Sequence, residues 1–235
     1  MSVYEDRVLT CPHCSHEMVK SVAVSLNGER AAVQRAQILD GTFQRFACER
    51  CHETFRADGP LIYIDFEAKL WIAVFPTLWE QRWWEHEDEP AAVFQRYMIE
   101  HCPPLVRSWA PGFTIRAVFG IERLREKLVA SAAAIDDRVL EAYKLDLLRG
   151  MGPFELTAAS RPRLRAVEGA MAAFHVPRPE PGVPERFAIV RVPRVELDRI
   201  AALGEDDWAD TIDVLSQGPY VDLGRILLPR TAGAA

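Results

Sequence analysis

The sequence Cys11-Pro12-His13-Cys14, together with Cys48-Glu49-Arg50-Cys51, decides the fold of the N-terminal region of this 235-residue chain. Each stretch has C-x2-C spacing, so a tight turn presents both sulfurs on one side. Two such turns supply four thiolates, the ligand set of tetrahedral structural zinc sites. We therefore predict one structural Zn2+ per chain, bound by Cys11, Cys14, Cys48 and Cys51. Because four sulfurs leave no coordination position for water, the ion is expected to stabilise the fold without taking part in chemistry.

Two alternatives remain open for these cysteines. The cysteines could form disulfide bonds or stay as free thiols, or a neighbouring histidine could replace one sulfur as a ligand; the candidates are His13, His16 and His52.

The remaining cysteine, Cys102, has no obvious partner, which favours a reducing compartment. No apolar run approaches the ~20 residues that span a bilayer, and the acidic start of the chain is unlike a signal peptide. We therefore expect a soluble, cytoplasmic protein that does not contact membranes.

The charge of the chain argues against binding to nucleic acid. The formal net charge is −6 at pH 7, and residues 1–60 carry eight acidic and seven basic side chains. Affinity for a phosphate backbone comes from clustered Lys and Arg, and the dense basic tract of this chain is Arg161-Pro162-Arg163-Leu164-Arg165. That tract is more typical of one charged face of a strand.

Hydrophobic periodicity predicts a mixture of strands and helices after the first cysteine pair. Strands are expected over 17–26, 42–47, 61–66, 70–75 and 113–119, and helices over 29–39, 91–102 and from Gly120 onward. Asn27 is a candidate N-cap of the first helix, and Gly41 is a candidate stop. A further helix begins near Asp136 and ends at Gly150, so the last two helices are predicted to form a helical hairpin.

Gly150-Met151-Gly152-Pro153 separates two predicted domains. Beyond it we expect strands over 154–158, 164–176 and 187–192, a stiff Pro-rich linker over 177–184, and a helix over 195–203. Residues 220–228 fit either an edge strand or a helix. The predicted fold class is α+β. Residues 1–150 are predicted to form an N-terminal zinc ribbon continuous with an antiparallel sheet and closed by the helical hairpin, and residues 151–235 are predicted to form a smaller α+β C-terminal extension.

A tryptophan-rich acidic segment, residues 79–89, is a candidate protein interface. Its indoles are Trp79, Trp83 and Trp84, and five carboxylates surround them. Carboxylates resist burial in a chain's own core, whereas exposed aromatic side chains surrounded by charge are typical of partner-binding surfaces. The spacing of Trp79 and Trp83 also allows simple packing within the molecule. His86 and its acidic neighbours could form a second metal cluster, but such a run more often forms a solvated face.

Beyond the cysteines, the chain resembles the CpXC family, bacterial proteins named for two Cys-Pro-x-Cys motifs. The resemblance covers roughly residues 8–149 and rests on Ile38-Leu39-Asp40-Gly41-Thr42, Leu61-Ile62-Tyr63-Ile64-Asp65-Phe66, Arg116-Ala117-Val118-Phe119-Gly120, Leu124-Arg125-Glu126-Lys127, and Asp136-Asp137-Arg138 with Glu141 and Lys144. It implies a metal-binding domain without an assigned activity. Two departures are the missing proline of the second motif, and Ser15 and His52 at positions where zinc knuckles often have Gly, which predicts strain there.

The sequence contains no recognisable nucleophile, phosphate-binding loop or open metal site, so we predict that the protein is not an enzyme. Asp136 and Asp137 with Glu141 could suggest paired carboxylates for acid–base catalysis, but Asp136 already has a capping role. The leading hypothesis is a non-catalytic, zinc-stabilised scaffold or adaptor that binds another protein or associates with itself. The alternative is a nucleic-acid-binding zinc-ribbon regulator.

Overall fold

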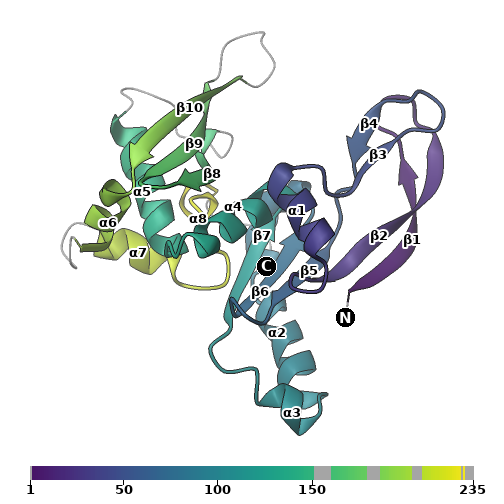
Figure 1. The fold of residues 1–235 in the computed structure, drawn as a ribbon, viewed down its shortest axis with the longest axis horizontal. Coiled ribbons are helices and arrows are strands. Elements are labelled where there is room, and N and C mark those ends of the chain that lie inside the picture. The colour runs from purple at the N-terminus through teal and green to yellow at the C-terminus, as the bar shows by residue number, and fades with distance from the viewer. Residues whose placement is uncertain (1, 151–159, 179–185, 203–207, 229, 231–235) are drawn as a thin grey trace. The chain divides into compact units, whose positions relative to one another are not determined.

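The structure is a computed structural model that describes residues 2–150, 160–178, 186–202, 208–228 and 230. The chain divides into two compact units (Figure 1): unit 1 is Met1–Glu80 with Glu89–Leu124, and unit 2 is Gln81–Asp88 with Arg125–Ala235. Both units contain strands and helices, which confirms the α+β class. The predicted strand over 154–158 and most of the predicted Pro-rich linker lie outside the described residues.

Unit 1 is built on a five-stranded sheet with the order β1-β2-β5-β6-β7. The strands are β1 (Val3–Thr10), β2 (Glu17–Asn27), β5 (Leu61–Asp65), β6 (Leu70–Phe75) and β7 (Thr114–Phe119). The pairs β1–β2 and β5–β6 are antiparallel, whereas β2–β5 and β6–β7 are parallel. The sheet is therefore mixed, in contrast to the antiparallel sheet predicted, because a long crossover connects each parallel pair and such crossovers permit parallel pairing.

The crossover from β2 to β5 carries α1 (Ala32–Asp40) and a two-stranded sheet of β3 (Arg45–Ala47) and β4 (Thr54–Arg56). Gly41 ends α1 as predicted, in the left-handed conformation with φ 86°, and its amide donates to Gln37 O. Asn27 is not the N-cap of α1. Its side chain accepts a hydrogen bond from the Arg30 amide one turn earlier, and the N-cap position is Ala31.

The crossover from β6 to β7 is mainly helical. It contains a 3-10 helix η1 (Thr77–Glu85), α2 (Glu89–Gln95), a π-helix η2 (Arg96–Glu100) and α3 (Pro104–Arg107). Together, α2 and η2 correspond to the helix predicted over 91–102. The Phe94 ring of α2 meets the Trp71 ring of β6 edge-on at 5.3 Å, within an apolar cluster that also contains Met98 and Ala110. This cluster buries one face of α2 against the sheet.

Unit 2 contains an antiparallel three-stranded sheet with the order β10-β9-β8. The strands are β8 (Arg163–Glu168), β9 (Met171–Arg178) and β10 (Arg186–Pro193). The single strand predicted over 164–176 is wrong, because the chain turns at Gly169 and forms the β8–β9 hairpin. Gly169 has a φ of 58°, a conformation that glycine adopts at low cost.

The helices of unit 2 begin with the predicted hairpin. These helices are α4 (Ile121–Ala132), whose first turn belongs to unit 1, α5 (Asp137–Gly150), α6 (Val195–Ala202), α7 (Ala209–Leu215) and α8 (Gly224–Leu227). Asp136 accepts the Arg138 amide, which confirms its capping role. Leu140 of α5 lies in the same apolar core as Phe174 of β9 and Leu197 of α6. The predicted domain boundary at residue 150 lies at the end of α5. The boundary between the two compact units lies earlier, within α4.

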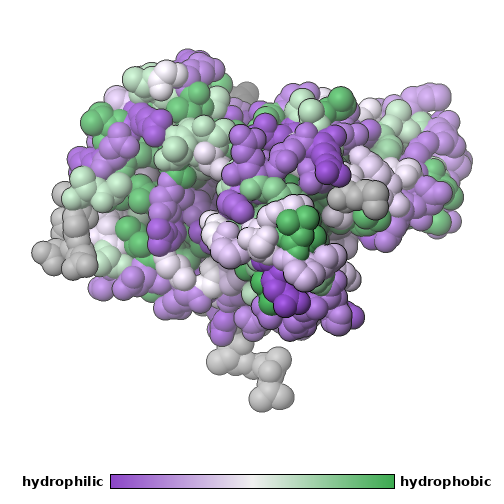
Figure 2. Space-filling view, turned by 60° about the horizontal axis from the view of Figure 1, so that its bottom comes forward, coloured by the Kyte–Doolittle hydropathy of each residue, from purple (hydrophilic) through white to green (hydrophobic). Residues whose placement is uncertain are grey.

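No helix in the described part of the chain is long and apolar enough to cross a membrane. On the face that Figure 2 shows, hydrophobic residues lie in small groups among hydrophilic ones.

Candidate metal centre

Two turns bring four cysteines together in unit 1. Cys11 and Cys14 lie between β1 and β2, and Cys48 and Cys51 lie between β3 and β4. All four sulfurs lie within 4.8 Å of one another, with Cys11 Sγ 3.7 Å from Cys51 Sγ and Cys14 Sγ 3.6 Å from Cys48 Sγ. Four sulfurs bound at about 2.3 Å to one tetrahedral ion would lie about 3.8 Å apart. The four cysteines are free thiols at a spacing that could hold a metal ion.

Both turns have the same backbone geometry. The Ser15 amide donates to Cys11 O at 2.9 Å, and the His52 amide donates to Cys48 O at 3.0 Å. Ser15 and His52 have left-handed φ values of 57° and 62°, a conformation that is costly for residues other than glycine. The strain predicted at these two positions is therefore present, and it accompanies the turn geometry that aims the sulfurs at one point.

Contacts within the group shift the pKa values of Cys48 and Cys51 in opposite directions. Burial opposes ionisation of Cys48, but the Cys51 and Arg50 amides, which donate to its sulfur, lower its pKa to about 6. For Cys51, the Glu53 amide favours the thiolate, but burial and the neighbouring sulfurs raise its pKa to about 12. Thiolates at this distance repel one another, so a cation among them is needed for all four to ionise together. A metal ion would supply that charge.

The candidate ligand group consists of cysteines alone. Within the described residues, no histidine joins the four sulfurs. His13 and His52 are exposed, and His16 is half-buried. The fifth cysteine, Cys102, lies in a different part of unit 1, where its thiol donates to Met98 O at 3.0 Å.

A comparison of the sequence with protein-family models places the chain in a known group. Residues 9–144, more than half of the chain, match the CpXC protein family. The chain belongs to the CpXC family. The family match includes both cysteine pairs of this CpXC protein and ends at Lys144, which confirms the resemblance seen in the sequence. No curated protein and no solved structure matches the chain.

The three tryptophans predicted as an interface lie in different environments. Trp79 belongs to unit 1, is 42% exposed and stacks on Phe75 with ring centroids 6.3 Å apart. Trp83 belongs to unit 2 and is 3% exposed. Trp84 is half-buried and meets the Trp83 ring edge-on at 5.9 Å. The interface role of this segment stays a prediction, and of the three indoles Trp79 is the most accessible to a partner.

Trp83 and Glu87 are buried in unit 2 by residues near the end of the chain. Trp83 Nε1 donates to Leu228 O at 2.9 Å, and the Arg225 guanidinium lies 4.5 Å from the centre of its ring. Glu87 is 6% exposed and forms ion pairs with Arg225 and Arg230. The expectation of a solvated acidic face is therefore wrong for Glu87, because two arginines balance its charge and make burial possible.

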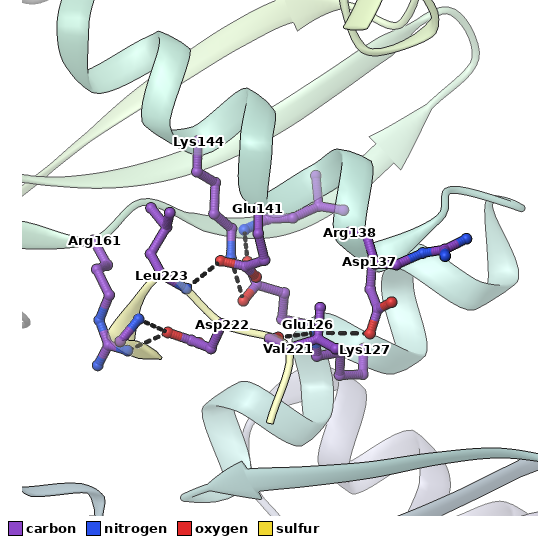
Figure 3. Close-up of polar contacts among 12 residues, drawn as sticks. Glu126, Lys127, Asp137, Arg138, Glu141, Lys144, Arg161, Val221, Asp222 and Leu223 are labelled. Carbon is purple, nitrogen blue, oxygen red and sulfur yellow. Dashed lines mark hydrogen bonds and ion pairs between the residues drawn. The ribbon is translucent and has the colours of Figure 1, made fainter. Parts of the chain in front are cut away.

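A second group of ligand-type side chains is buried in unit 2 (Figure 3). Glu126 from α4 and Glu141 and Lys144 from α5 are each at most 1% exposed. Lys144 Nζ donates to Glu141 Oε1 at 2.6 Å and pairs with Glu126 Oε2 at 2.8 Å. The other two carboxylate oxygens accept the amides of Leu164 at 2.6 Å and Leu223 at 3.0 Å. Every carboxylate oxygen of this pair therefore has a donor.

Residues 221–223 complete this buried cluster. Lys127 Nζ donates to Val221 O at 2.5 Å and pairs with Asp137 Oδ2 at 2.9 Å. Asp222 is buried and forms an ion pair with Arg161, which is 4% exposed. Figure 3 shows residues 221–223 crossing the side chains of α4 and α5, so segments far apart in the sequence share one network.

Glu126, Glu141 and Asp222 also have carboxylate oxygens within 4.8 Å of one another, a spacing that could hold a cation. Burial raises the pKa of Glu141, and the nearby Lys144 ammonium opposes that rise. Because each of these carboxylates is already paired with Lys144 or Arg161, we assign this cluster to the packing of unit 2.

Sequence analysis grouped Glu141 with Asp136 and Asp137 and did not identify Lys144 as its buried basic partner. A signal was present in the sequence, because Lys144 follows Leu140 by four residues and therefore lies on the apolar face of α5. A lysine at such a position indicates a buried partner of opposite charge.

Proposed function

We propose that the four cysteines bind one structural Zn2+. The observation that carries the proposal is the set of four sulfurs within 4.8 Å of one another, joined by no histidine or carboxylate in the described chain. Thiolates favour Zn2+ over Mg2+ and Ca2+, which prefer oxygen ligands. Four thiolates complete a tetrahedral shell, so a substrate would find no open position on the ion. The ion would tie the β1–β2 turn to the β3–β4 turn.

Zinc content tests this assignment. Elemental analysis of protein purified without added metal should find one equivalent of zinc per chain. Cys48→Ser should lose the ion, whereas Cys102→Ser, which alters the cysteine outside the centre, should keep it. Less than half an equivalent of zinc, with two disulfides detected by mass, would contradict the proposal.

We further propose that the protein is a non-catalytic scaffold or adaptor of the bacterial cytoplasm that binds a protein partner. A closed metal centre supports a structural role for the ion. Exposed apolar side chains in unit 1 support protein binding, among them Val8, Trp79 and Leu105 at 63%, 42% and 65% exposure. These side chains would gain burial in a complex.

The nucleic-acid alternative has less support. In the basic tract Arg161 is buried in its ion pair with Asp222, and Arg163 and Arg165 are half-buried. Arginines held in this way contribute little to a phosphate-binding surface.

Affinity purification of the intact protein, with mass spectrometry of the proteins that co-elute, tests the adaptor proposal. A protein that co-elutes stoichiometrically and is weakened by Trp79→Ala would support it. Fluorescence anisotropy with single- and double-stranded DNA and RNA tests the alternative. A sub-micromolar affinity that decreases with salt would favour the nucleic-acid function instead.

A further inference from the structure

The outer edge of β1 is a long, open strand edge. β1 is the first strand in the sheet order, and among the described residues no strand pairs with its outer side. It is eight residues long, and none of its side chains is buried. Its register with β2 is regular from Tyr4 to Thr10. β1 lies at one edge of the sheet (Figure 1). The outward N–H and C=O groups of an open strand edge are a template for another strand.

One face of this edge carries exposed apolar side chains. Tyr4 and Val8 lie on the same face of β1, because side chains alternate along a strand. Val8 is directly opposite Val19 of β2. The three side chains are 45%, 63% and 63% exposed, in the order Tyr4, Val8, Val19. Apolar side chains next to an open edge would be covered by a strand that pairs there.

The charge pattern of β1 fits a second copy of itself. Two antiparallel copies of one strand are related by a twofold axis perpendicular to the sheet, which keeps each face of the strand on the same side. With the axis at Asp6, Glu5 of each copy faces Arg7 of the other. In the same register, Tyr4 of each copy faces Val8 of the other.

The two neighbouring registers place less favourable side chains opposite each other. An axis at Glu5 places the two Glu5 side chains opposite each other and Tyr4 opposite Asp6. An axis at Arg7 places the two Arg7 side chains opposite each other and Val8 opposite Asp6. Opposite charges and apolar pairs stabilise cross-strand positions, and like charges destabilise them. The register centred on Asp6 has two ion pairs and two apolar pairs against one repulsive Asp6 pair.

We propose that β1 pairs with β1 of a second copy in a twofold-symmetric antiparallel dimer centred on Asp6. The two five-stranded sheets then form one continuous sheet. In the single chain, Arg7 Nη2 lies 2.9 Å from Glu5 Oε2 of its own strand, so both groups are already on one face and change partners in the dimer. The dimer deepens the proposed protein-binding function by naming its partner, and it does not depend on which metal the cysteines hold.

Charge reversal tests this register. Glu5→Arg and Arg7→Glu should each weaken the dimer at least tenfold, measured by sedimentation velocity over a concentration series. A 1:1 mixture of the two variants should recover the wild-type affinity, because both pairs between positions 5 and 7 in the mixed dimer join a base to an acid. Asp6→Asn should strengthen the wild-type dimer by removing the repulsive pair.

The controls separate assembly from folding. Arg107→Glu, at an exposed position of α3, changes the net charge by the same amount as Arg7→Glu and should leave the dimer unchanged. Zinc content and thermal unfolding of each variant should match the wild type. A wild-type protein that stays monomeric, a dimer that survives either reversal, or a mixture that does not recover would overturn the dimer. A monomer that still carries one equivalent of zinc would leave the metal assignment intact.

Discussion

The cysteine centre of unit 1 and the buried cluster of unit 2 both hold metal-ligand side chains within 4.8 Å of one another, but they differ in charge balance. The hydrogen-bond contacts found for the four sulfurs among the described residues are with one another and with backbone amides, including that of Arg50, whereas the three carboxylates are paired with Lys144 and Arg161. Anionic ligands without a cation repel one another and favour binding of a metal ion. Carboxylates that are already paired with buried bases repel one another less and do not favour a metal ion in the same way. Ligand spacing therefore identifies a metal site only together with the charges that surround it.

The two clusters also differ in access. Cys14 and Cys51 are half-buried, so a metal ion can reach the sulfurs from solvent. Glu126 and Glu141 are each 1% exposed, and their oxygens are enclosed by hydrogen-bond donors. We therefore expect loss of metal to affect the first cluster and leave the second unchanged.

The largest expected effect is removal of metal with a strong chelator. The binding free energy of a structural ion contributes directly to folding. Hydrogen exchange should therefore show loss of protection in β3, β4 and the turn between β1 and β2, while β9 and α5 keep theirs. Loss of protection in α5 at the same chelator concentration would show that the second cluster also depends on a metal.

The next largest loss of stability is expected from Lys144→Met. This substitution removes the base of the second cluster and leaves an apolar side chain of similar length. Two buried carboxylates would then share no ammonium, and leaving buried charges unpaired costs about 3–5 kcal/mol. The pKa of Glu141, which burial already raises, would rise further above its value in the unfolded chain, about 4.3 for Glu. The folded variant would then bind more protons than the unfolded chain, so its stability should fall as pH rises through the folded pKa.

Urea unfolding of Lys144→Met at pH 5 and pH 8 measures this effect. The variant's unfolding free energy should lie closer to that of the wild type at pH 5 than at pH 8. Adding Glu126→Gln and Glu141→Gln should recover part of the lost stability at pH 8, because the uncompensated charges are gone. A variant as stable as the wild type at both values would show that Lys144 does not balance the cluster.

An effect of similar or smaller size is expected from Trp83→Ala, which removes an indole that contacts the last described residues of unit 2. Truncating a buried Trp costs about 3 kcal/mol or more, and the Leu228 carbonyl would lose its donor. Trp79→Ala is the matched control in unit 1, where the indole is 42% exposed, and should cost about 1 kcal/mol or less. Thermal unfolding of both variants compares them. Equal losses would mean that Trp83 is not part of the core of unit 2.

Much of the cysteine centre could be predicted from the sequence because its information is local. The C-x2-C spacing defines each turn, and Ser15 and His52 signalled the strained backbone that the structure contains. β1 itself was missed, although Val3, Tyr4 and Val8 precede the first cysteine with strand-forming side chains.

The second cluster could not be predicted in the same way because its partners are distant. Lys127 and Val221 are 94 residues apart, and Glu141 and Leu223 are 82 residues apart. Helical periodicity indicates which face of α4 or α5 is buried but not which segment covers that face. Glu87 was assigned to solvent for the same reason, since its arginines lie more than 130 residues later.

The smallest expected effect concerns an exposed ion pair beside the buried ones. The Arg138 side chain, which pairs with Asp136, lowers the pKa of that carboxyl. The pair therefore stabilises the fold above the unfolded pKa of about 3.9 and loses its effect as pH falls through the folded pKa. Because both side chains are exposed, solvent limits this effect to below about 1 kcal/mol.

Asp136→Asn measures the charge effect alone, because Asn keeps the N-cap of α5. Asp136→Ala also removes the cap and should cost about 1 kcal/mol more. Unfolding free energies of both variants between pH 3 and pH 7 give the two contributions. If Asp136→Asn lowered the unfolding free energy as much as Lys144→Met, exposed and buried ion pairs would contribute equally to stability, contrary to this expectation.

The long separations within the second cluster bear on synthesis of the chain by the ribosome. All four cysteines have been made once residue 51 is translated, so the metal centre can form while most of the chain is still to be synthesised. Lys127 and Glu141 must wait for Val221 and Leu223, and until then their charges remain hydrated. If the cysteines bind their metal during synthesis, the nascent chain carries an ordered cysteine centre while unit 2 is still incomplete. A ribosome stalled before residue 221 would then expose the uncovered surface of α4 and α5 to chaperones and proteases.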